Sequence, residues 1–129
     1  MQRDLNLGLA KHLGMRFIEA TPERVVAELE IREELCTLGG AIHGGTLMAL
    51  ADTAGAIGTL SFLEHNPAAG KGTATLESKT NFFAAARAGK VRAEATPLHK
   101  GKRTHVWQTR ITDENGKLLS LTIQTQMIL

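Results

Sequence analysis

The segment from Gly39 to Gly55 holds the residues whose types and spacing could do chemistry. Gly44 and Gly45 follow His43 at the start of a predicted helix. Because glycines have no side chains, they leave the free N–H groups of a first helical turn open to a ligand. The positive end of the helix dipole lies at the same place. Together these groups could form an oxyanion hole for a carbonyl under attack.

Asp52 adds a carboxylate to this segment, inside the otherwise apolar stretch from Met48 to Ala56. Burying a carboxylate is costly unless it is paired or used. Carboxylates with perturbed pKa values are common at functional sites, but they also occur in structural hydrogen-bond networks. Two interpretations therefore stay open at this point. Asp52 is either catalytic or a structural hydrogen-bonder that contacts Thr53 or a neighbouring strand.

The order of these motifs resembles the hotdog-fold thioesterases of the phenylacetate-degradation type. Their signature is a His-Gly-Gly at the start of a central helix, followed by Leu-Ala-Asp-Thr, as in residues 43–45 and 50–53. Later stretches also look like strands and turns of that family; they are Thr75–Phe83, Gly89–Ala95, Lys100–Arg103 and Asp113–Leu118. The resemblance covers roughly residues 14–129.

The resemblance implies hydrolysis of acyl-CoA thioesters to free acid and coenzyme A, without a cofactor beyond the coenzyme A of the substrate. Asp52 would act as general base or nucleophile, and the Gly44 N–H would polarise the thioester carbonyl. His43 would shape that site, and the Thr75 hydroxyl would orient the attacking water. Thr37 stands where many members carry an asparagine, and its hydroxyl could still hold a water.

Two other functions of the same fold remain as alternatives. An enoyl-thioester hydratase has a recognisable pairing of His with Asp or Glu that differs from this one. A non-catalytic acyl-CoA sensor would bind its ligand without turnover. Regulatory hotdog proteins carry an added DNA-binding segment, and about 14 residues before the fold are too few for a helix-turn-helix domain.

Several of these residues also have plainer explanations. His43 could be only a helix cap, and the paired glycines could only ease a tight turn. Cys36 has no histidine and aspartate at interpretable spacing, so we do not expect a nucleophilic thiol. Trp107 is predicted to be a core or interface side chain. No metal is predicted, because metal-ligand spacing is lacking among His12, His65, His99 and His105.

Helix geometry supplies an argument that does not depend on the family. His43 and Asp52 are nine residues apart, which corresponds to about 13.5 Å along a helix axis and about 180° around it. The two side chains of one chain cannot flank the same thioester. A shared site must therefore be built from two chains, which predicts a two-fold homodimer with two equivalent sites and, beyond it, a dimer of dimers.

Basic residues near the predicted turns could bind the phosphates of coenzyme A. The candidates are Lys102 and Arg103, together with Arg87 and Lys90. The alternative is an ordinary solvated turn. The net charge of +2 is small and the remaining basic residues are spread along the chain, so no nucleic-acid partner is expected.

The composition indicates one globular domain over residues 1–129, with 43% hydrophobic and 22% charged residues. The single cysteine, Cys36, excludes an intrachain disulfide and is compatible with a reducing compartment. No signal sequence or membrane-spanning run is recognised. We therefore expect a cytoplasmic protein with no membrane partner.

Two helices are predicted from hydrophobic spacing. The first lies within residues 1–13, with Asp4 as its N-cap and Gly14 as its end. The second covers residues 43–63 and is apolar almost all round, so it should be buried. This long helix would carry both the glycine pair and the carboxylate.

Strands are predicted on both sides of the long helix. Period-two alternation gives two strands within residues 15–32, joined by a turn at Thr21 and Pro22. Four more follow in hairpin succession, at about 72–84, 89–99, 103–113 and 117–129. This order predicts an α+β class, with one antiparallel sheet wrapped around a central helix, which is the hotdog fold.

Overall fold

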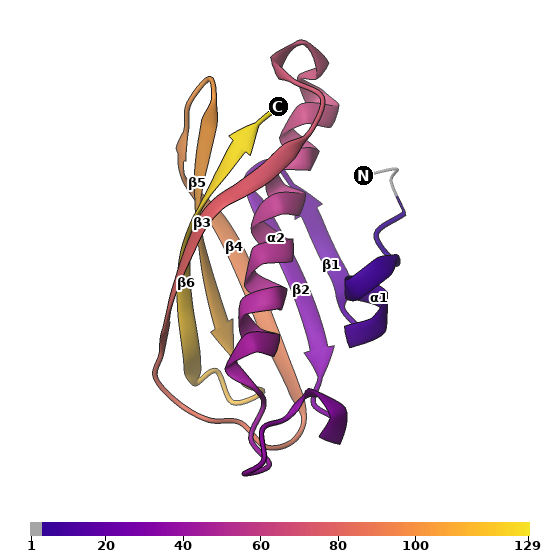
Figure 1. Cartoon of the computed structure of the whole chain (residues 1–129), viewed down its shortest axis with the longest axis vertical. Helices are drawn as coiled ribbons and strands as arrows, with labels where there is room; N and C mark the ends of the chain where they lie inside the picture. Colours follow the sequence, from indigo (N-terminus) through magenta and orange to yellow (C-terminus); the bar gives the residue numbers. More distant parts are fainter. Residues whose placement is uncertain (1–3) are drawn as a thin grey trace.

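A six-stranded antiparallel sheet curves around one long helix in the computed structural model, which describes residues 4–129 (Figure 1). The elements in chain order are α1 (Gly8–Leu13), β1 (Arg16–Thr21), β2 (Arg24–Glu30), the 3₁₀ helix η1 (Glu33–Leu35), α2 (Gly44–His65), the 3₁₀ helix η2 (Pro67–Ala69), β3 (Thr73–Phe82), β4 (Lys90–Lys100), β5 (Thr104–Thr112) and β6 (Leu118–Ile128). The predicted α+β class is confirmed, and the predicted central helix extends two residues further, to His65.

The strand order is β1-β2-β4-β5-β6-β3. One predicted pairing is wrong, because β3 does not form a hairpin with β4 but pairs with β6 at the far edge of the sheet. The cause is the path of α2, which crosses the concave face between β2 and β3 and delivers the chain to the opposite edge (Figure 1). Residues 83–89 then return the chain to β4, beside β2.

The buried side of α2 explains its apolar sequence. Leu50, Ala51 and Ala54 are fully buried against the inner face of the sheet. Among the helices described, α2 is long and apolar enough to cross a membrane. Most of its residues pack inside the fold, so this composition is that of a core helix.

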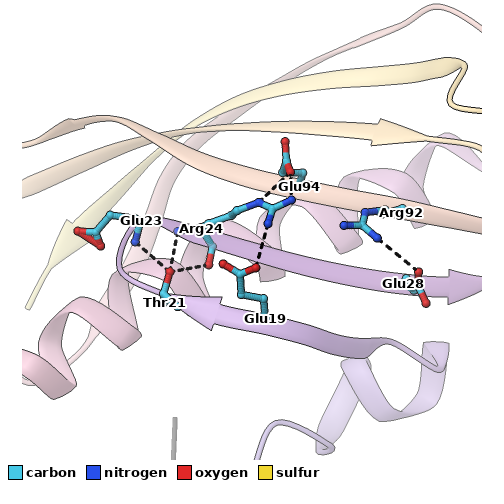
Figure 2. Close-up of polar contacts among 7 residues, drawn as sticks. All are labelled: Glu19, Thr21, Glu23, Arg24, Glu28, Arg92 and Glu94. Carbon is cyan, nitrogen blue, oxygen red and sulfur yellow. Dashed lines mark hydrogen bonds and ion pairs between the residues drawn. The ribbon is translucent and has the colours of Figure 1, made fainter.

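The outer face of β1, β2 and β4 carries a ladder of paired charges (Figure 2). Arg24 donates to Glu94 at 2.8 Å and to Glu19 at 2.9 Å. Arg92 lies 3.9 Å from Glu28. The hydrogen bond and charge of Glu94 raise the pKa of Arg24 above its ordinary value. These polar residues alternate with buried ones that face α2, as the period-two pattern predicts.

The first helix is shorter than predicted. It begins at Gly8 after the N-cap residue Leu7, and Asp4 instead accepts a hydrogen bond of 2.9 Å from the Asn6 N–H. Asp4 is therefore not the cap. The predicted end is confirmed at Gly14, whose φ of 83° suits glycine. The first three residues of the predicted helix lie outside the described residues.

Candidate active site

The N-terminal end of α2 has an open backbone donor. His43 is the N-cap residue, and its Nδ1 accepts a hydrogen bond of 2.7 Å from the Gly45 N–H. Thr46 and Leu47 donate their N–H groups to the His43 carbonyl oxygen. In the described part of the chain, the Gly44 N–H has no acceptor. It is therefore free for a ligand oxygen at the positive end of the helix dipole.

Close neighbours favour glycine at this helix end. A Cβ added at Gly44 would lie 3.1 Å from the Phe82 ring, and one at Gly45 would lie 2.9 Å from His43 Nδ1. Because His43 Nδ1 accepts the Gly45 hydrogen, the neutral imidazole carries its own proton on Nε2. The exposed His43 ring can therefore cap the helix and still donate a hydrogen bond.

Asp52 lies in the middle of α2 and is half-buried. Its Oδ1 accepts hydrogen bonds of 2.6 Å from Thr75 Oγ1 on β3 and 3.2 Å from Gln124 Nε2 on β6. Among residues 4–129, no donor reaches its Oδ2. The expected contact with Thr53 does not form, because that hydroxyl donates to the Ala49 carbonyl oxygen. Asp52 thus bonds to neighbouring strands and keeps one oxygen free.

A second glutamine fixes the direction of the Thr75 hydroxyl. Gln126 Nε2 donates to Thr75 Oγ1 at 2.6 Å, and Gln126 Oε1 accepts from Thr73 Oγ1 at 3.0 Å. Since Thr75 has a single hydroxyl hydrogen and already accepts from Gln126, that hydrogen is donated to Asp52. The resemblance implied that this hydroxyl orients the attacking water. In this chain its hydrogen is donated to Asp52 instead.

Sequence reasoning missed both glutamines. Gln124 and Gln126 are fully buried on the inner face of β6. Leu121, Ile123 and Met127 alternate with them on the opposite face, whereas the apolar Leu119 and Ile128 of the same strand are buried. Between residues 121 and 127 the phase of the alternation is therefore the reverse of what hydrophobicity alone favours. The sequence did contain one signal for these residues, because two glutamines two positions apart must share one face of a strand.

Gly55 makes room for one of these glutamines. A Cβ at this position would lie 2.6 Å from Gln124 Cδ, closer than real contacts allow. The Gln124 amide nitrogen also lies 3.2 Å from the Asp52 main-chain oxygen. A larger residue at position 55 would push this amide away from the carboxylate. Gly55 therefore allows Gln124 to form its hydrogen bond to Asp52.

Thr37 lies in the loop before α2, at the His43 end of the helix rather than beside Asp52. Its Oγ1 accepts a hydrogen bond of 3.2 Å from the Gly39 N–H, which closes a local turn. The neighbouring Cys36 forms an isolated antiparallel bridge to Ile42. Any water held by Thr37 would therefore lie near the helix start.

One chain does not bring all the predicted residues together. Gly44 and Asp52 are eight residues apart on α2, which corresponds to about 12 Å along the axis. Thr75 and Gln124 contact the carboxylate end. The structure therefore shows two half-sites along the same helix, one with the open N–H and one with the carboxylate.

Comparison with known proteins places these half-sites in a family. The profile of the thioesterase superfamily matches residues 39–120, which include Gly44, Asp52 and Thr75. The chain belongs to the thioesterase superfamily. A 1,4-dihydroxy-2-naphthoyl-CoA hydrolase of Listeria monocytogenes is 34% identical over 115 residues, covering 89% of this chain and 90% of that protein.

Solved structures of other superfamily members share the fold. A thioesterase from Haemophilus influenzae has a TM-score of 0.85 and 30% sequence identity, covering 93% of this chain and 81% of that one. The Escherichia coli PaaI protein of the phenylacetic acid degradation operon has a TM-score of 0.85 and 25% identity, covering 96% and 86%. The hotdog fold and the resemblance to the PaaI type are confirmed, and thioester hydrolysis is supported as the general activity.

The basic residues expected to bind phosphates form two separate pairs, one near each end of α2. Lys102 and Arg103 lie in the β4–β5 turn, near the C-terminal end of α2, whereas Arg87 and Lys90 lie near its start (Figure 1). The strand between them has 11 residues, so the two pairs are about 33 Å apart. Arg87 also donates to the Gly39 carbonyl oxygen. One chain therefore does not form a single phosphate cluster.

A pocket of about 440 Å³ opens beside the β4–β5 turn. Its lining consists of Phe62, Ala69, Lys100, Gly101, Lys102 and Ile128. The Lys100 Nζ lies 5.6 Å from the centroid of the Phe62 ring and 3.2 Å from Glu23 Oε1. An aromatic face beside two lysines suits an anionic ligand with a flat apolar part.

A buried polar cluster lies further inside this end of the fold. His105 Nδ1 is 3.1 Å from Thr59 Oγ1, which also accepts a hydrogen bond of 2.9 Å from Trp107 Nε1. Trp107 is fully buried, so the predicted core position is confirmed. Burial, followed by the charges of Lys100 and His99, lowers the pKa of His105. This cluster contacts neither half-site, and we assign it to the core.

Proposed function

We propose that this chain hydrolyses acyl-CoA thioesters to the free acid and coenzyme A. The observation that carries the proposal is the Asp52 carboxylate, whose Oδ1 is held by Thr75 and Gln124 while Oδ2 is free. Membership of the thioesterase superfamily supports hydrolysis, and one relative is named for a CoA thioester. Coenzyme A enters as part of the substrate, and the proposed chemistry needs no other cofactor.

The reaction needs a group that attacks or activates water and a donor for the developing oxyanion. As a base, Asp52 takes a proton from water, and the hydroxide adds to the carbonyl carbon. As a nucleophile, Asp52 adds directly and forms an anhydride that water then cleaves. In both routes the Gly44 N–H donates to the negative carbonyl oxygen. The C–S bond breaks, and the thiolate of coenzyme A leaves and takes up the proton.

A second copy of the chain completes the site in this proposal. Along the edge strand β3, Gly44 lies beside Phe82 and Asp52 lies beside Thr75. If β3 pairs antiparallel with β3 of a second copy, with Phe82 opposite Thr75, Gly44 of one chain approaches Asp52 of the other. The two-fold axis then passes near Ser78. His43 and Gly45 line the same end as the Gly44 donor.

Side chains on β3, and Phe83 directly after it, favour this pairing. Leu76, Phe82 and Phe83 are 57%, 50% and 58% exposed, which is a large apolar surface for an edge strand. Ser78 Oγ is buried without a hydrogen-bond partner in the described chain. A second β3 would cover the apolar side chains and supply polar groups near Ser78. A homodimer is thus the smallest active unit that we propose, and a dimer of dimers would repeat it.

The same pairing would bring part of the basic set to the shared site. It sets the end of β3 in one chain beside the start of β3 in the other, where the β4–β5 turn with Lys102 and Arg103 lies. Arg87 of the first chain follows the end of its β3, whereas Lys90 stays three strands away on β4. We assign the phosphates of coenzyme A to this region. The pocket at Phe62 would then take the flat base of the nucleotide.

A thiol-release assay tests the proposed hydrolysis. The purified protein is incubated with short, long, branched and aryl-acetyl CoA esters and with 1,4-dihydroxy-2-naphthoyl-CoA, and free thiol is measured. We expect release from at least one class. Binding of these esters without release from any of them would instead favour the acyl-CoA sensor. Hydration of an enoyl ester without thiol release would favour the hydratase.

The variant Asp52→Asn assigns any activity to the proposed carboxylate. The amide keeps the shape of the side chain but removes the base or nucleophile, so kcat should fall by about 10²–10⁴. Ligand binding, measured by calorimetry with a CoA ester, should change little. Near-normal turnover in this variant would remove Asp52 from the mechanism.

A further inference from the structure

Two buried glutamines of β6 hold the carboxylate on one side. We infer that Gln124 and Gln126 are positioning residues that fix Oδ1 of Asp52 and so present Oδ2 to the substrate or the attacking water. The inference rests on the proposed hydrolysis and adds the residues that orient its carboxylate. Hydrogen-bond directions, an unpaired buried oxygen and the glycine that makes room for Gln124 support it.

The orientation of the Gln124 amide follows from its neighbours. Its Nε2 lies 3.2 Å from Oδ1 of Asp52 and 3.2 Å from the Asp52 main-chain oxygen. Both of these atoms are acceptors, so the nitrogen must face Asp52. Gln124 Oε1 is left buried without a partner in the part of the chain that the structure describes. Leaving a buried acceptor unpaired costs stability. The cost is explained if the donated hydrogen serves the site.

Gln126 acts one step further from the carboxylate. Its Nε2 lies 2.6 Å from Thr75 Oγ1. Thr73 Oγ1 lies 3.0 Å from Gln126 Oε1 and 2.8 Å from the Met127 carbonyl oxygen, so its one hydrogen does not set the amide. Because Asp52 Oδ1 only accepts, Thr75 donates to it and accepts from the Gln126 amide nitrogen. If the Gln126 amide were reversed, Thr75 would donate to it instead, and the carboxylate would lose a donor. These hydrogen bonds therefore link Gln126 on β6 to Asp52 through the Thr75 hydroxyl.

The strand that carries both glutamines suits this role. β6 is paired on both sides, with β5 and β3, so its backbone is held more firmly than that of an edge strand. Gly55 lets the Gln124 amide approach α2 closely enough to reach Asp52. Two donors on Oδ1 restrict rotation of the carboxylate. Its other oxygen then keeps the same direction in every turnover.

The variant Gln124→Met separates positioning from a structural role. It keeps a similar length, removes the donor to Asp52 and removes the unpaired Oε1. We expect kcat to fall about 10- to 100-fold with little change in KM, while the Tm is unchanged or higher. A lower Tm with an unchanged kcat would overturn the inference for Gln124.

A double-mutant cycle tests the path through Thr75. Gln126→Leu alone should lower kcat about tenfold, because the Thr75 hydrogen is no longer directed at Asp52. In a Thr75→Val background, Gln126→Leu should add no further loss, since no hydroxyl remains to be directed. Thr75→Ser should keep most of the activity. Losses that multiply in the double variant would show that Gln126 does not act through Thr75, and would overturn the inference.

Thr125→Val is the matched control. Thr125 stands between the two glutamines, but its hydroxyl lies on the opposite face and donates to Glu77 Oε1 at 2.7 Å. This variant should keep the wild-type kcat. In the glutamine variants alone, kcat should fall while KM changes little.

The outcomes separate this inference from the proposed function. A wild-type protein that releases no thiol from any ester would overturn both. An active wild type that loses activity in Asp52→Asn, but keeps its kcat in both glutamine variants, would confirm the function and overturn the inference alone. An equal loss of kcat in Thr125→Val and Gln124→Met would also overturn it. The loss would then come from a general disturbance of β6 and not from the missing hydrogen bond to Asp52.

Discussion

Two glycines of α2 lie against large buried side chains, and each contact has a different consequence. A Cβ at Gly55 would lie 2.6 Å from Gln124, which contacts Asp52, whereas a Cβ at Gly58 would lie 2.3 Å from the Trp107 ring in the core. Gly55→Ala should therefore lower kcat by about tenfold or more by displacing the Gln124 amide. The measurement is steady-state thiol release by the folded variant.

Gly58→Ala is the control for the Gly55 variant, because it makes the same substitution one turn further along the helix. Overpacking against Trp107 should cost about 1–3 kcal/mol of unfolding free energy, partly offset by the higher helix propensity of alanine. Urea unfolding should show this loss, with a smaller effect on kcat than in Gly55→Ala. The opposite ranking of the two variants in kcat would contradict the assignment of Gly55 to the site.

His105 makes the stability of the fold depend on pH. Its Nδ1 lies against the Thr59 hydroxyl, and its Nε2 is buried without a partner within residues 4–129. Burial lowers the pKa of His105 below its ordinary value of 6.5, so the unfolded chain takes up this proton more readily than the folded one. The stability contributed by neutral His105 is therefore complete above that value and is lost as the pH falls below it.

Urea unfolding at pH 7.5 and pH 5.5 measures this dependence. The wild type should lose unfolding free energy at the lower pH, and His105→Gln, which cannot take up the proton, should lose less. His12→Gln is the control, because His12 is exposed on α1. Equal losses in the wild type and His105→Gln would assign the acid sensitivity to other groups.

The carboxylate side of the site was only partly predictable from the sequence. Asp52 stood out because a charge in an apolar helix needs a reason, and Thr75 followed from its place in the motif order. Gln124 and Gln126 gave no such signal, because they come more than 70 residues after Asp52. Strand pairing and packing bring Gln124 to Asp52 and Gln126 to Thr75. Local patterns show which residues share a face, but not what that face meets.

The elements themselves were predicted more completely than their arrangement. Alternation and turn residues located all six strands and the long helix within a few residues. The position of β3 was not predicted, because neighbouring strands usually pair and nothing in the sequence shows that α2 crosses the whole sheet. The phase of β6 was also hidden, since its polar residues face the inside. Both features depend on contacts between distant segments.

The β4–β5 turn gives a test of phosphate recognition. Lys102→Ala combined with Arg103→Ala should raise KM for a CoA ester more than for a short pantetheine thioester of the same acid, because only the CoA ester carries the nucleotide phosphates. Both substrates should keep a similar kcat. The measurement is a pair of saturation curves for wild type and variant. Equal changes in KM for both substrates would place the coenzyme A site elsewhere.

The whole molecule has two sheet edges that differ in character. β1 at one edge exposes one large apolar side chain, Ile18, next to Glu19, whose charge is paired with Arg24 on β2. β3 at the other edge presents the exposed Leu76 and Phe82 and touches both half-sites. Charged edges resist pairing, whereas apolar ones favour it. The edge that lies beside Gly44 and Asp52 is thus also the edge at which we propose a second copy.

A two-chain site can be tested by mixing two inactive variants. His43→Ala affects the helix-start half-site and Asp52→Asn affects the carboxylate half-site, which lie on opposite sides of the proposed two-fold axis. Each variant alone is expected to be inactive, and circular dichroism checks that His43→Ala keeps its fold without the cap. The two are co-expressed with different affinity tags, and the mixed dimers are purified before thiol release is measured.

Recovery in the mixed dimer follows from the symmetry. If each site joins His43 of one chain to Asp52 of the other, a mixed dimer has one site with both substitutions and one site with neither. Random pairing makes half of the dimers mixed, so about a quarter of the wild-type activity should return in the unpurified mixture and about half in the purified mixed dimers. If both residues served a site within one chain, every site would keep one substitution and no activity would return. An inactive mixed dimer would therefore rule out the shared site and leave His43 or Asp52 with a structural role.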